Sequence, residues 1–530
     1  MKVLVTDKIN DIAVKIIEKV AEVDNLPTMS EEELIKVIPE YDALMVRSQT
    51  KVTAKIIEAG KNLKIIGRAG VGVDNIDVEA ATQKGIIVVN SPDGNTMAAA
   101  EHTIALMLAM ARNIAPAATS TKAGKWDRSK FTGCELYKKT LGIIGLGKIG
   151  SHVAEVAQAL GMKLAVYDPY TSEEVVTKMG AEYVSDLEKF WAKPDFITVH
   201  VPKTKETANL INKDTIAKMK DGVRLVNCAR GGIINELDLK EALDSKKVAA
   251  AAIDVFENEP NIDTCPLIHT EGNVVLTPHL GASTNEAQIN VAVDVAEQIR
   301  EVLSGGSASS AVNIPSLRPD KLEPVKDYMM IAENSGKLAS QLAKGTIKQI
   351  EITAQGNLAD LDIQPLEVAV LKGALSNALE GVNYVNAPII AKTRNINIVS
   401  TRSNKKCNFA GLLTIKLTTT EGSFVVAGAL VAVDIPRIVK IDEYETSIRP
   451  EKHMLIVPHT NQPSMIAKVA QVIGANGINI GSMNVVQKND KHETESIMVI
   501  NVDSVVENNV LSEIEKINGV HNPTYVNLNV

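Results

Sequence analysis

The chain has few aromatic residues and few cysteines. Aromatic residues make up only 3% of the 530 positions, so the hydrophobic cores must be built from Ala, Val, Ile and Leu, which suit buried parallel strands. The cysteines, Cys134, Cys228, Cys265 and Cys407, lie far apart in the sequence. Their spacing fits neither a disulfide framework nor a zinc site, so we expect reduced thiols and no bound metal.

Dense basic blocks and long apolar runs are also missing. A net charge of −8 without clustered Lys and Arg argues against a nucleic-acid or an anionic-membrane surface. The longest apolar run that we find, residues 424–433, is far shorter than the ~20 residues that span a bilayer. We therefore expect a cytoplasmic protein that binds small molecules and has roughly three or four folded domains, given its length and a hydrophobic content of 45%.

The most informative pattern is a glycine-rich segment between an apolar strand and a helix. Residues 141–144 run into Gly145-Leu-Gly147-Lys-Ile-Gly150, a helical pattern covers residues 151–160, and a second apolar run ends at Asp168. Gly145 permits a tight turn, Gly147 lets the backbone approach a pyrophosphate, and Gly150 allows close packing of helix on strand. A carboxylate at Asp168 would bind the adenosine ribose hydroxyls and repel a 2′-phosphate, so the pattern predicts NAD rather than NADP.

Short β-branched runs alternate with helical patterns through roughly the first half of the chain, which predicts two parallel α/β units in succession. Capping boxes are expected at Ser30 with Glu33 and at Ser283 with Glu286. The helical pattern after Glu286 returns the chain to the first unit. The first domain is therefore expected to comprise residues 1–95 and 283–305, around a dinucleotide-binding domain of residues 96–282. Strands are expected at residues 3–6, 41–46, 63–66, 86–89, 141–144, 164–167, 196–201, 225–227, 249–255 and 274–276.

The second part of the chain has a different pattern. Residues 304–310 are small and typical of a linker. Residues 312–450 begin with a helical stretch and continue in alternating strands such as 413–417 and 424–433, which predicts an α+β domain. Residues 452–530 follow the order βαββαβ of a ferredoxin-like unit. The predicted fold class is α/β, with two Rossmann-like doubly wound domains followed by these two α+β domains.

Candidate catalytic residues follow three predicted strands of the dinucleotide-binding unit, where open α/β sheets place their ligands. Arg230 can hold a carboxylate and polarise a neighbouring carbonyl. His279 can accept and return a proton near neutral pH, and Glu259 would orient its ring and favour its charged form. Each residue alone fits a surface or structural role, but together, after a dinucleotide motif, they predict a dehydrogenase site.

Two further arginines follow predicted strands of the first unit. Arg47 and Arg68 would converge on the cleft between the units and hold a dianion. Each alone fits a solvated surface arginine equally well.

These segments resemble the D-2-hydroxyacid dehydrogenase family, whose members carry an Arg–Glu–His set. The resemblance spans residues of about 1–305 and rests on the glycine motif, Asn227-Cys-Ala-Arg-Gly-Gly and Pro278-His-Leu-Gly-Ala-Ser. Within the family, Gly67-Arg-Ala-Gly-Val-Gly-Val-Asp-Asn-Ile-Asp77 and Gly94-Asn-Thr-Met-Ala-Ala-Ala-Glu101 resemble the members that oxidise 3-phospho-D-glycerate. Some bacterial members have an arginine where this chain has Gln49.

The resemblance implies roles for further residues. Asn95 would contact substrate together with Arg47 and Arg68, and Arg128 would reach the active site of a neighbouring subunit in a homodimer or homotetramer. NAD would be bound by the glycine motif and by residues that follow later strands. These positions are Gly145, Gly147, Lys148, Ile149, Gly150, Asp168, His200, Val201, Pro202, Thr207, Cys228, Ala229, Arg230, Asp254, His279, Gly281 and Ala282.

The implied reaction is the NAD-dependent oxidation of 3-phospho-D-glycerate to 3-phosphohydroxypyruvate, the entry to phosphorylated L-serine synthesis. His279 would take the hydroxyl proton while Arg230 holds the substrate carboxylate. Two alternatives stay open: a glycerate or hydroxypyruvate reductase of the same family, and an NADH-sensing corepressor-like binding protein.

The C-terminal unit resembles ACT domains, which bind amino acids. By that resemblance His459, Asn461 and Asn479 would meet an L-serine effector where two such domains pair. The two asparagines are equally suited to helix caps and turns. Ser464 stands where these domains usually have glycine, so its side chain would crowd the ligand or alter the loop.

Overall fold

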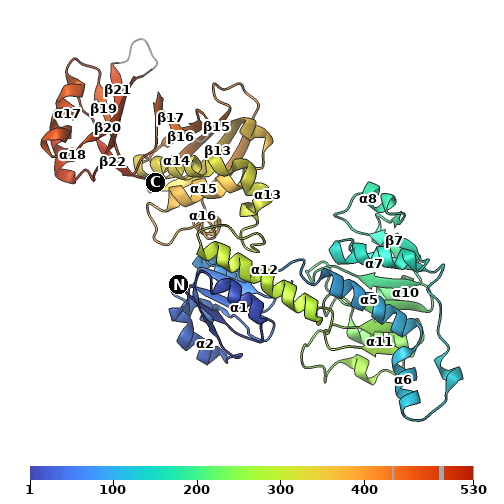
Figure 1. Ribbon diagram of the computed structural model, residues 1–530. Coiled ribbons are helices and arrows are strands. Elements are labelled where there is room, and N and C mark those ends of the chain that lie inside the picture. Colours follow the sequence, from blue (N-terminus) through green and yellow to red (C-terminus); the bar gives the residue numbers. More distant parts are fainter. Residues whose placement is uncertain (433–434, 489–493, 529–530) are drawn as a thin grey trace.

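The computed structural model of the protein describes residues 1–432, 435–488 and 494–528. Its units follow one another along an extended molecule, with the C-terminal unit far from the dinucleotide-binding unit (Figure 1). The long helix α12 (Asn285–Leu303) lies along the first unit, and one of its ends is directed towards the dinucleotide-binding unit. The predicted α/β class with two additional domains is confirmed. Among the described residues, no helix is both long and apolar enough to cross a bilayer.

The first unit is a parallel sheet with the order β2-β1-β3-β4-β5. Buried side chains on one face pack against α1 and α12, and those on the other face pack against α2, α3 and α4. The short polar strand β2 was not predicted. The elements are β1 (Lys2–Val5), α1 (Asp11–Ile17), β2 (Glu22–Asn25), α2 (Glu31–Val37), β3 (Ala43–Val46), α3 (Ala54–Ala59), β4 (Ile65–Arg68), α4 (Val78–Lys84) and β5 (Ile87–Val89).

The two predicted capping boxes have different outcomes. At α2, the Ser30 side chain accepts from the Glu33 backbone N–H, and the Glu33 carboxylate accepts from the Ser30 backbone N–H, as predicted. At α12 the prediction is wrong, because Thr284 is the capping residue and its hydroxyl accepts from the backbone N–H of Ala287 at 3.1 Å. Ser283 belongs to the preceding turn.

The dinucleotide-binding unit has a parallel sheet with the order β12-β11-β10-β9-β6-β7-β8. From β6 the sheet continues through β7 and β8 on one side and through β9 to β12 on the other. The carboxyl ends of β6 and β9 therefore form a topological switch point, where such sheets bind ligands. The two-residue strand β8 was not predicted. The strands are β6 (Thr140–Ile144), β7 (Lys163–Tyr167), β8 (Glu182–Tyr183), β9 (Phe196–Val199), β10 (Val223–Asn227), β11 (Val248–Ile253) and β12 (Val274–Leu276). The helices are α5 (Thr96–Ala111), α6 (Ile114–Lys122), α7 (Lys148–Ala159), α8 (Glu173–Lys178), α9 (Leu187–Phe190), α10 (Lys213–Lys218) and α11 (Glu236–Asp244).

The small-residue segment after α12 packs against the first unit rather than running free. Ser310 donates from its hydroxyl to the Asn90 carbonyl, and the Asn313 side chain accepts from the Val88 backbone N–H. Ala308 and Ala311 are buried in the core beneath α1 and α12. The composition of residues 304–310 predicted a linker, but the backbone that follows them pairs with the first unit at Val89.

The third unit is a mixed sheet with the order β14-β13-β15-β16-β17-β18, packed against α14 and α15. The strand expected at residues 424–433 ends at Leu430, and Val433 lies outside the described residues. The elements are α13 (Pro319–Leu322), α14 (Lys326–Leu342), β13 (Ile347–Gly356), α15 (Gln364–Leu375), α16 (Ala387–Thr393), β14 (Asn397–Ser403), β15 (Gly411–Thr419), β16 (Ser423–Leu430), β17 (Pro436–Ile441) and β18 (Tyr444–Ile448).

The C-terminal unit has the predicted βαββαβ order and an antiparallel sheet ordered β20-β21-β19-β22. One face packs against α17 and α18. The opposite face, which includes Ile456 and Val499, shares a hydrophobic core with the third unit. Gln341 of α14 also exchanges two hydrogen bonds with the backbone of Asn527. The elements are β19 (His453–Thr460), α17 (Met465–Ala475), β20 (Ile480–Gln487), β21 (Glu495–Val502), α18 (Asn508–Glu515) and β22 (Thr524–Asn527).

Candidate active site

The glycine loop between β6 and α7 has the geometry of an anion-binding turn. Gly145 has a φ of 92°, and a side chain there would come within 2.6 Å of the His200 carbonyl oxygen. A side chain at Gly150 would collide with the Gly145 carbonyl, whereas one at Gly147 would meet open space. No side chain caps the N-terminus of α7. The loop therefore leaves backbone N–H groups open to a ligand, as a pyrophosphate requires.

The carboxylate of Asp168 is bound at the end of β7 beside this loop. It accepts from the backbone N–H of Leu146 at 2.7 Å and from that of Tyr170 at 2.8 Å. Asp168 thus holds the glycine loop, in addition to the ribose-binding role predicted for it.

Lys148, the first residue of α7, forms an ion pair with Asp93 of the first unit at 2.5 Å. Ile149 is partly buried against the core under the helix.

Residues after β9 form a second wall of the site. The Thr207 hydroxyl donates to the Pro202 carbonyl at 2.6 Å and so fixes the turn between them. The ring of His200 lies 3.0 Å from the Thr198 hydroxyl, and burial lowers the pKa of His200 to about 4, so this ring is neutral near pH 7. Val201 lies against the glycine loop.

The loop after β10 is shaped by Asn227. Its side-chain oxygen accepts from the Ala229 backbone N–H at 3.0 Å, and its amide nitrogen donates to the Arg230 carbonyl at 2.9 Å. The Arg230 guanidinium donates to the Ala229 carbonyl and lies 3.6 Å from the Asp74 carboxylate of the first unit. Burial raises the pKa of Cys228 to about 12, so its thiol is protonated at neutral pH.

Glu259 and His279 form the predicted pair. Nδ1 of His279 lies 2.6 Å from Oε2 of Glu259, whose other oxygen accepts from the Phe256 backbone N–H at 2.8 Å. Burial pushes the pKa of Glu259 upward, but the bonds from His279 and Phe256 outweigh it and keep that pKa below its ordinary value. Glu259 is therefore an ionised acceptor that holds the imidazole by one nitrogen.

Arg68, the last residue of β4, and Asn95, which precedes α5, each have a buried polar atom without a hydrogen-bond partner among the described residues. Nη1 of Arg68 donates to the Gly72 carbonyl at 2.5 Å, but its buried Nε has no hydrogen-bond partner in the described structure. Burial, followed by the charge of Arg230, lowers the pKa of Arg68. The buried side-chain oxygen of Asn95, at the start of α5, is likewise unpartnered among the described residues. Arg47 bonds the Lys8 carbonyl at the same sheet edge. Converging positive charges here favour an anionic ligand.

The sequence did not assign a role to Asp74, Thr277 or His102. Both Thr277 and His102 contact Asp254, which was predicted to bind the cofactor. In the structure the Asp254 side chain is fully buried, and its carboxylate holds the loop of Gly281. Ala282 continues that loop. His102 stands between Glu101 and Thr103 in the sequence, so no local pattern singled it out.

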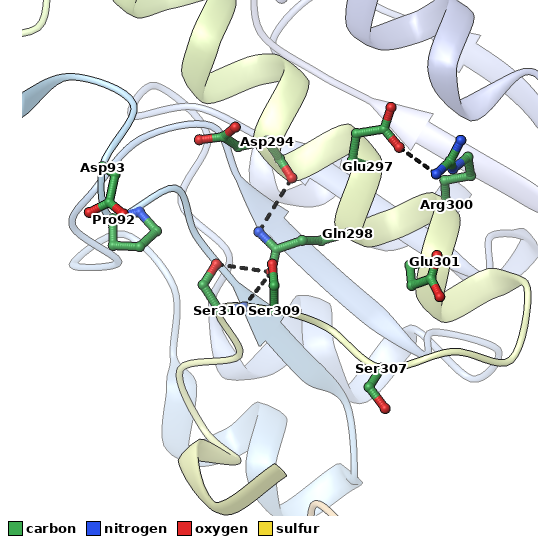
Figure 2. A pocket seen from close by; sticks show the side chains of 10 residues that line it. All are labelled: Pro92, Asp93, Asp294, Glu297, Gln298, Arg300, Glu301, Ser307, Ser309 and Ser310. Atoms are coloured by element: carbon green, nitrogen blue, oxygen red, sulfur yellow. Dashed lines mark hydrogen bonds and ion pairs between the residues drawn. The ribbon is translucent and has the colours of Figure 1, made fainter. Parts of the chain in front are cut away.

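A pocket of about 500 Å³ lies beside α12 (Figure 2). It is bounded by α12, the turn at Pro92 and Asp93, and the serines that follow α12. Glu297 is paired with Arg300 at 2.7 Å, and Ser310 bonds Gln298. None of the predicted catalytic or substrate residues lines it, so the pocket is separate from the site in the cleft.

The remaining predicted residues lie in other parts of the chain. Arg128 is exposed in the short segment that follows α6, and α6 projects from the dinucleotide-binding unit (Figure 1). In the C-terminal unit, His459 is buried and contacts the Val457 carbonyl, whereas Asn461 and Asn479 are exposed. The Asn479 side chain donates to Asp503 at 2.9 Å. Within the described residues, no hydrogen bond joins the three predicted effector residues.

Comparisons with known proteins identify the family of the chain. Residues 104–281 match the family model "D-isomer specific 2-hydroxyacid dehydrogenase, NAD binding domain", and residues 324–442 match "D-3-phosphoglycerate dehydrogenase intervening domain". The D-3-phosphoglycerate dehydrogenase of Synechocystis is 50% identical over 529 residues, covering 99% of this chain and 95% of that protein. That of Methanocaldococcus jannaschii is 46% identical over 529 residues, covering 100% of both.

A solved structure also matches more than half of the chain. The NAD⁺-bound 3-phosphoglycerate dehydrogenase of Entamoeba histolytica is 33% identical, with a TM-score of 0.50, and the match covers 59% of this chain and 98% of that one. The two full-length dehydrogenases therefore match this chain along nearly its whole length. The chain belongs to the D-3-phosphoglycerate dehydrogenases of the D-isomer specific 2-hydroxyacid dehydrogenase family.

Proposed function

We propose that this chain oxidises 3-phospho-D-glycerate to 3-phosphohydroxypyruvate with Arg230, Glu259 and His279 as its catalytic residues. The observation that carries the proposal is the 2.6 Å contact between His279 and an ionised Glu259. The two residues follow β12 and β11, and β11 pairs with β10, the strand that precedes Arg230. NAD is the cofactor, and its nicotinamide accepts the hydride from the substrate carbon. The reaction is the entry step of L-serine synthesis.

His279 acts as the base in this proposal. Because Nδ1 is bound to Glu259, Nε2 is the ring nitrogen that takes the substrate hydroxyl proton. Glu259 stabilises the imidazolium that results, since a carboxylate at hydrogen-bond distance favours the charged ring. His279→Asn should therefore lower turnover by about 10²–10⁴-fold and leave NADH binding nearly unchanged.

The proposed substrate has an anionic group at each end, and the site offers arginines for both: Arg230 for one end, and Arg68 with Arg47 for the other. Arg230 binds the carboxylate through its planar donors, after exchanging its contact with Asp74. Arg68 and Arg47 hold the phosphate, and the unpartnered Nε of Arg68 supports a ligand at that place. Asn95 donates or accepts at the same cleft. An unphosphorylated acid would leave the desolvated Arg68 without its counter-charge.

A turnover assay with 3-phospho-D-glycerate, D-glycerate and hydroxypyruvate tests the proposal. We expect phosphorylated substrate to be strongly preferred. Preference for the unphosphorylated acids would favour the glycerate or hydroxypyruvate reductase instead. NADH binding without turnover of any of these acids would favour the corepressor-like protein.

We also propose that the chain forms a homodimer or homotetramer through the arm that contains α6. Trp126 is 86% exposed on this arm and Arg128 lies beside it without a partner among the described residues. Burial of such a surface by a second subunit would bring Arg128 to that subunit's cleft. Sedimentation of Trp126→Asp should show a shift towards monomer if the arm forms the interface.

L-Serine is the effector proposed for the C-terminal unit. Asn461 and Asn479 are exposed near β19 and β20, where a second domain would complete a site. Calorimetric titration of L-serine into the full chain and into Asn461→Ala tests this idea. Unchanged binding by the variant, or heat of binding absent from the full chain, would contradict it.

A further inference from the structure

His102 lies next to the start of the loop of residues 277–282, which carries His279. It comes from α5, and its Nε2 is 3.1 Å from Oδ1 of Asp254 and 3.4 Å from the hydroxyl of Thr277. Its side chain is only 19% exposed. Because a carboxylate can only accept, the Nε2 of His102 must carry the hydrogen of this bond.

Asp254 is the anchor of the loop that carries His279. Its carboxylate accepts from the Thr277 hydroxyl at 2.6 Å, from the Leu280 backbone N–H at 2.8 Å and from the Gly281 backbone N–H at 2.9 Å. Its backbone carbonyl accepts from the N–H of His279 itself at 2.8 Å. Asp254, which is fully buried, therefore holds the loop of residues 277–281 through four hydrogen bonds.

His279 needs such an anchor because its backbone is strained. Its φ is 54°, in the left-handed region that residues with a side chain rarely adopt. Strain of this kind persists only where the surroundings determine the conformation, and here the bonds to Asp254 flank the strained residue on both sides. A small rotation of the Asp254 carboxylate would move the imidazole away from Glu259.

We infer that His102 is a positioning residue for proton transfer, which fixes the Asp254 carboxylate and, through it, the loop that aims His279. The inference rests on the role proposed above for His279. His102 is the one side chain from outside the β11 and β12 strand ends that the described structure places on this carboxylate. If His102 no longer donates, the buried Asp254 carboxylate loses one partner and reorients towards its remaining donors.

A pair of substitutions separates positioning from packing. His102→Gln keeps an amide N–H near the place of the ring Nε2, whereas His102→Leu keeps bulk and removes the donor. We expect His102→Leu to lower kcat by about 10–100-fold, because a misplacement of about 1 Å has effects of that order. Substrate KM and the NADH Kd should change less than kcat does, since Arg230, Arg68 and the glycine loop lie outside the loop that His102 would fix. His102→Gln should recover most of kcat. His269→Leu, at the exposed end of the short 3₁₀ helix Pro266–His269, should match the wild type.

A folded His102→Leu with wild-type kcat would overturn the inference, and so would equal losses in the Leu and Gln variants. If His102→Leu does not fold, His102→Asn replaces it, because the shorter amide does not reach Asp254, and the same expectations apply.

A double substitution keeps this test distinct from that of the proposed function. In a His279→Asn background, His102→Leu should not lower the residual kcat further, because the group that it positions is gone. Full additivity of the two losses would overturn the inference. Wild-type turnover by His279→Asn alone would instead refute the proposed role of His279.

Discussion

At the scale of single residues, the Glu259–His279 pair has a defined pH dependence. The folded-state pKa of Glu259 lies below its ordinary value of 4.5, so the pair adds stability that is present above pH 4.5 and is lost as pH falls through the lowered pKa. Glu259→Gln should therefore lower the melting temperature at pH 7 and approach the wild type in strong acid. After allowance for partial exposure, we expect about 1 kcal/mol, or about 2–4 °C.

Thermal melts of both proteins between pH 3 and 8 measure this difference. Glu155→Gln is a matched control, because Glu155 forms a more exposed pair with His152 at 3.3 Å on α7. A deficit in Glu259→Gln that stays constant down to pH 3 would show that the charge of Glu259 does not stabilise the fold.

Arg68 should discriminate between phosphorylated and unphosphorylated substrates. Arg68→Ala removes a desolvated charge from the cleft, so kcat/KM for 3-phospho-D-glycerate should fall by roughly tenfold to more than a hundredfold. Activity with D-glycerate should fall far less. Steady-state kinetics on both acids measure the ratio, with the exposed Arg394→Ala as control. Equal losses on both acids would assign Arg68 a structural role.

Residue roles could be predicted where local spacing determines them. The turn at Gly145 and the contact of His279 with Glu259 involve patterns that a sequence displays directly, because each residue follows a strand in the same sheet. The hydrogen bond between His102 and Asp254 joins residues that are 152 positions apart in the sequence, so it could not be predicted from a local sequence pattern. The inward direction of Asp254 likewise depends on the packing of α5 on the sheet.

At the scale of elements, the start of α17 carries strain that one substitution can relieve. Ser464 has a φ of 69°, a conformation that glycine adopts without the steric cost of a side chain. Ser464→Gly should therefore stabilise the C-terminal unit by about 1 kcal/mol, reduced in part by the greater entropy of the unfolded glycine. Urea denaturation measures the gain. Ser447→Gly in β18 should lose stability instead, and a destabilised Ser464→Gly would contradict the strain argument.

Elements with strong hydrophobic patterns were predictable, and short polar ones were not. β2 reads Glu-Val-Asp-Asn and β8 has two residues, so neither shows a period from which a strand can be predicted. Their position comes from pairing with β1 and β7. The cap at α12 was misassigned because Ser283 and Thr284 are both good capping residues, and only the backbone direction decides between them.

At the scale of the whole molecule, the third and C-terminal units should unfold together. Their sheets share a hydrophobic core, and Gln341 bonds the backbone of β22. Differential scanning calorimetry should show one transition for this pair, and NAD should raise the temperature of a different transition. Ile456→Asn, in the shared core, should lower the joint transition. Independent melting of the C-terminal unit in the unaltered chain would contradict the shared core.

Domain composition alone did not predict how the units join. Residues 304–310 have a linker composition, but the backbone that follows pairs with Val89 and the side chains of Asn313 and Ser310 bond the first unit. The third unit also contacts this unit, where Asn383 donates to the Gly85 carbonyl at 2.9 Å. Such contacts depend on surfaces that are far apart in sequence.

The scarcity of aromatic residues gives the molecule two separate optical reporters. Of its 2 tryptophans, Trp191 is fully buried in the dinucleotide-binding unit, whereas Trp126 stands 86% exposed on the α6 arm. Trp191 should emit at short wavelength and report the unfolding of that unit. Trp126 should emit at long wavelength in a free subunit and shift to the blue when another surface covers it. With Trp126→Phe as the blank, intrinsic fluorescence can follow assembly and unfolding in one sample without an added dye.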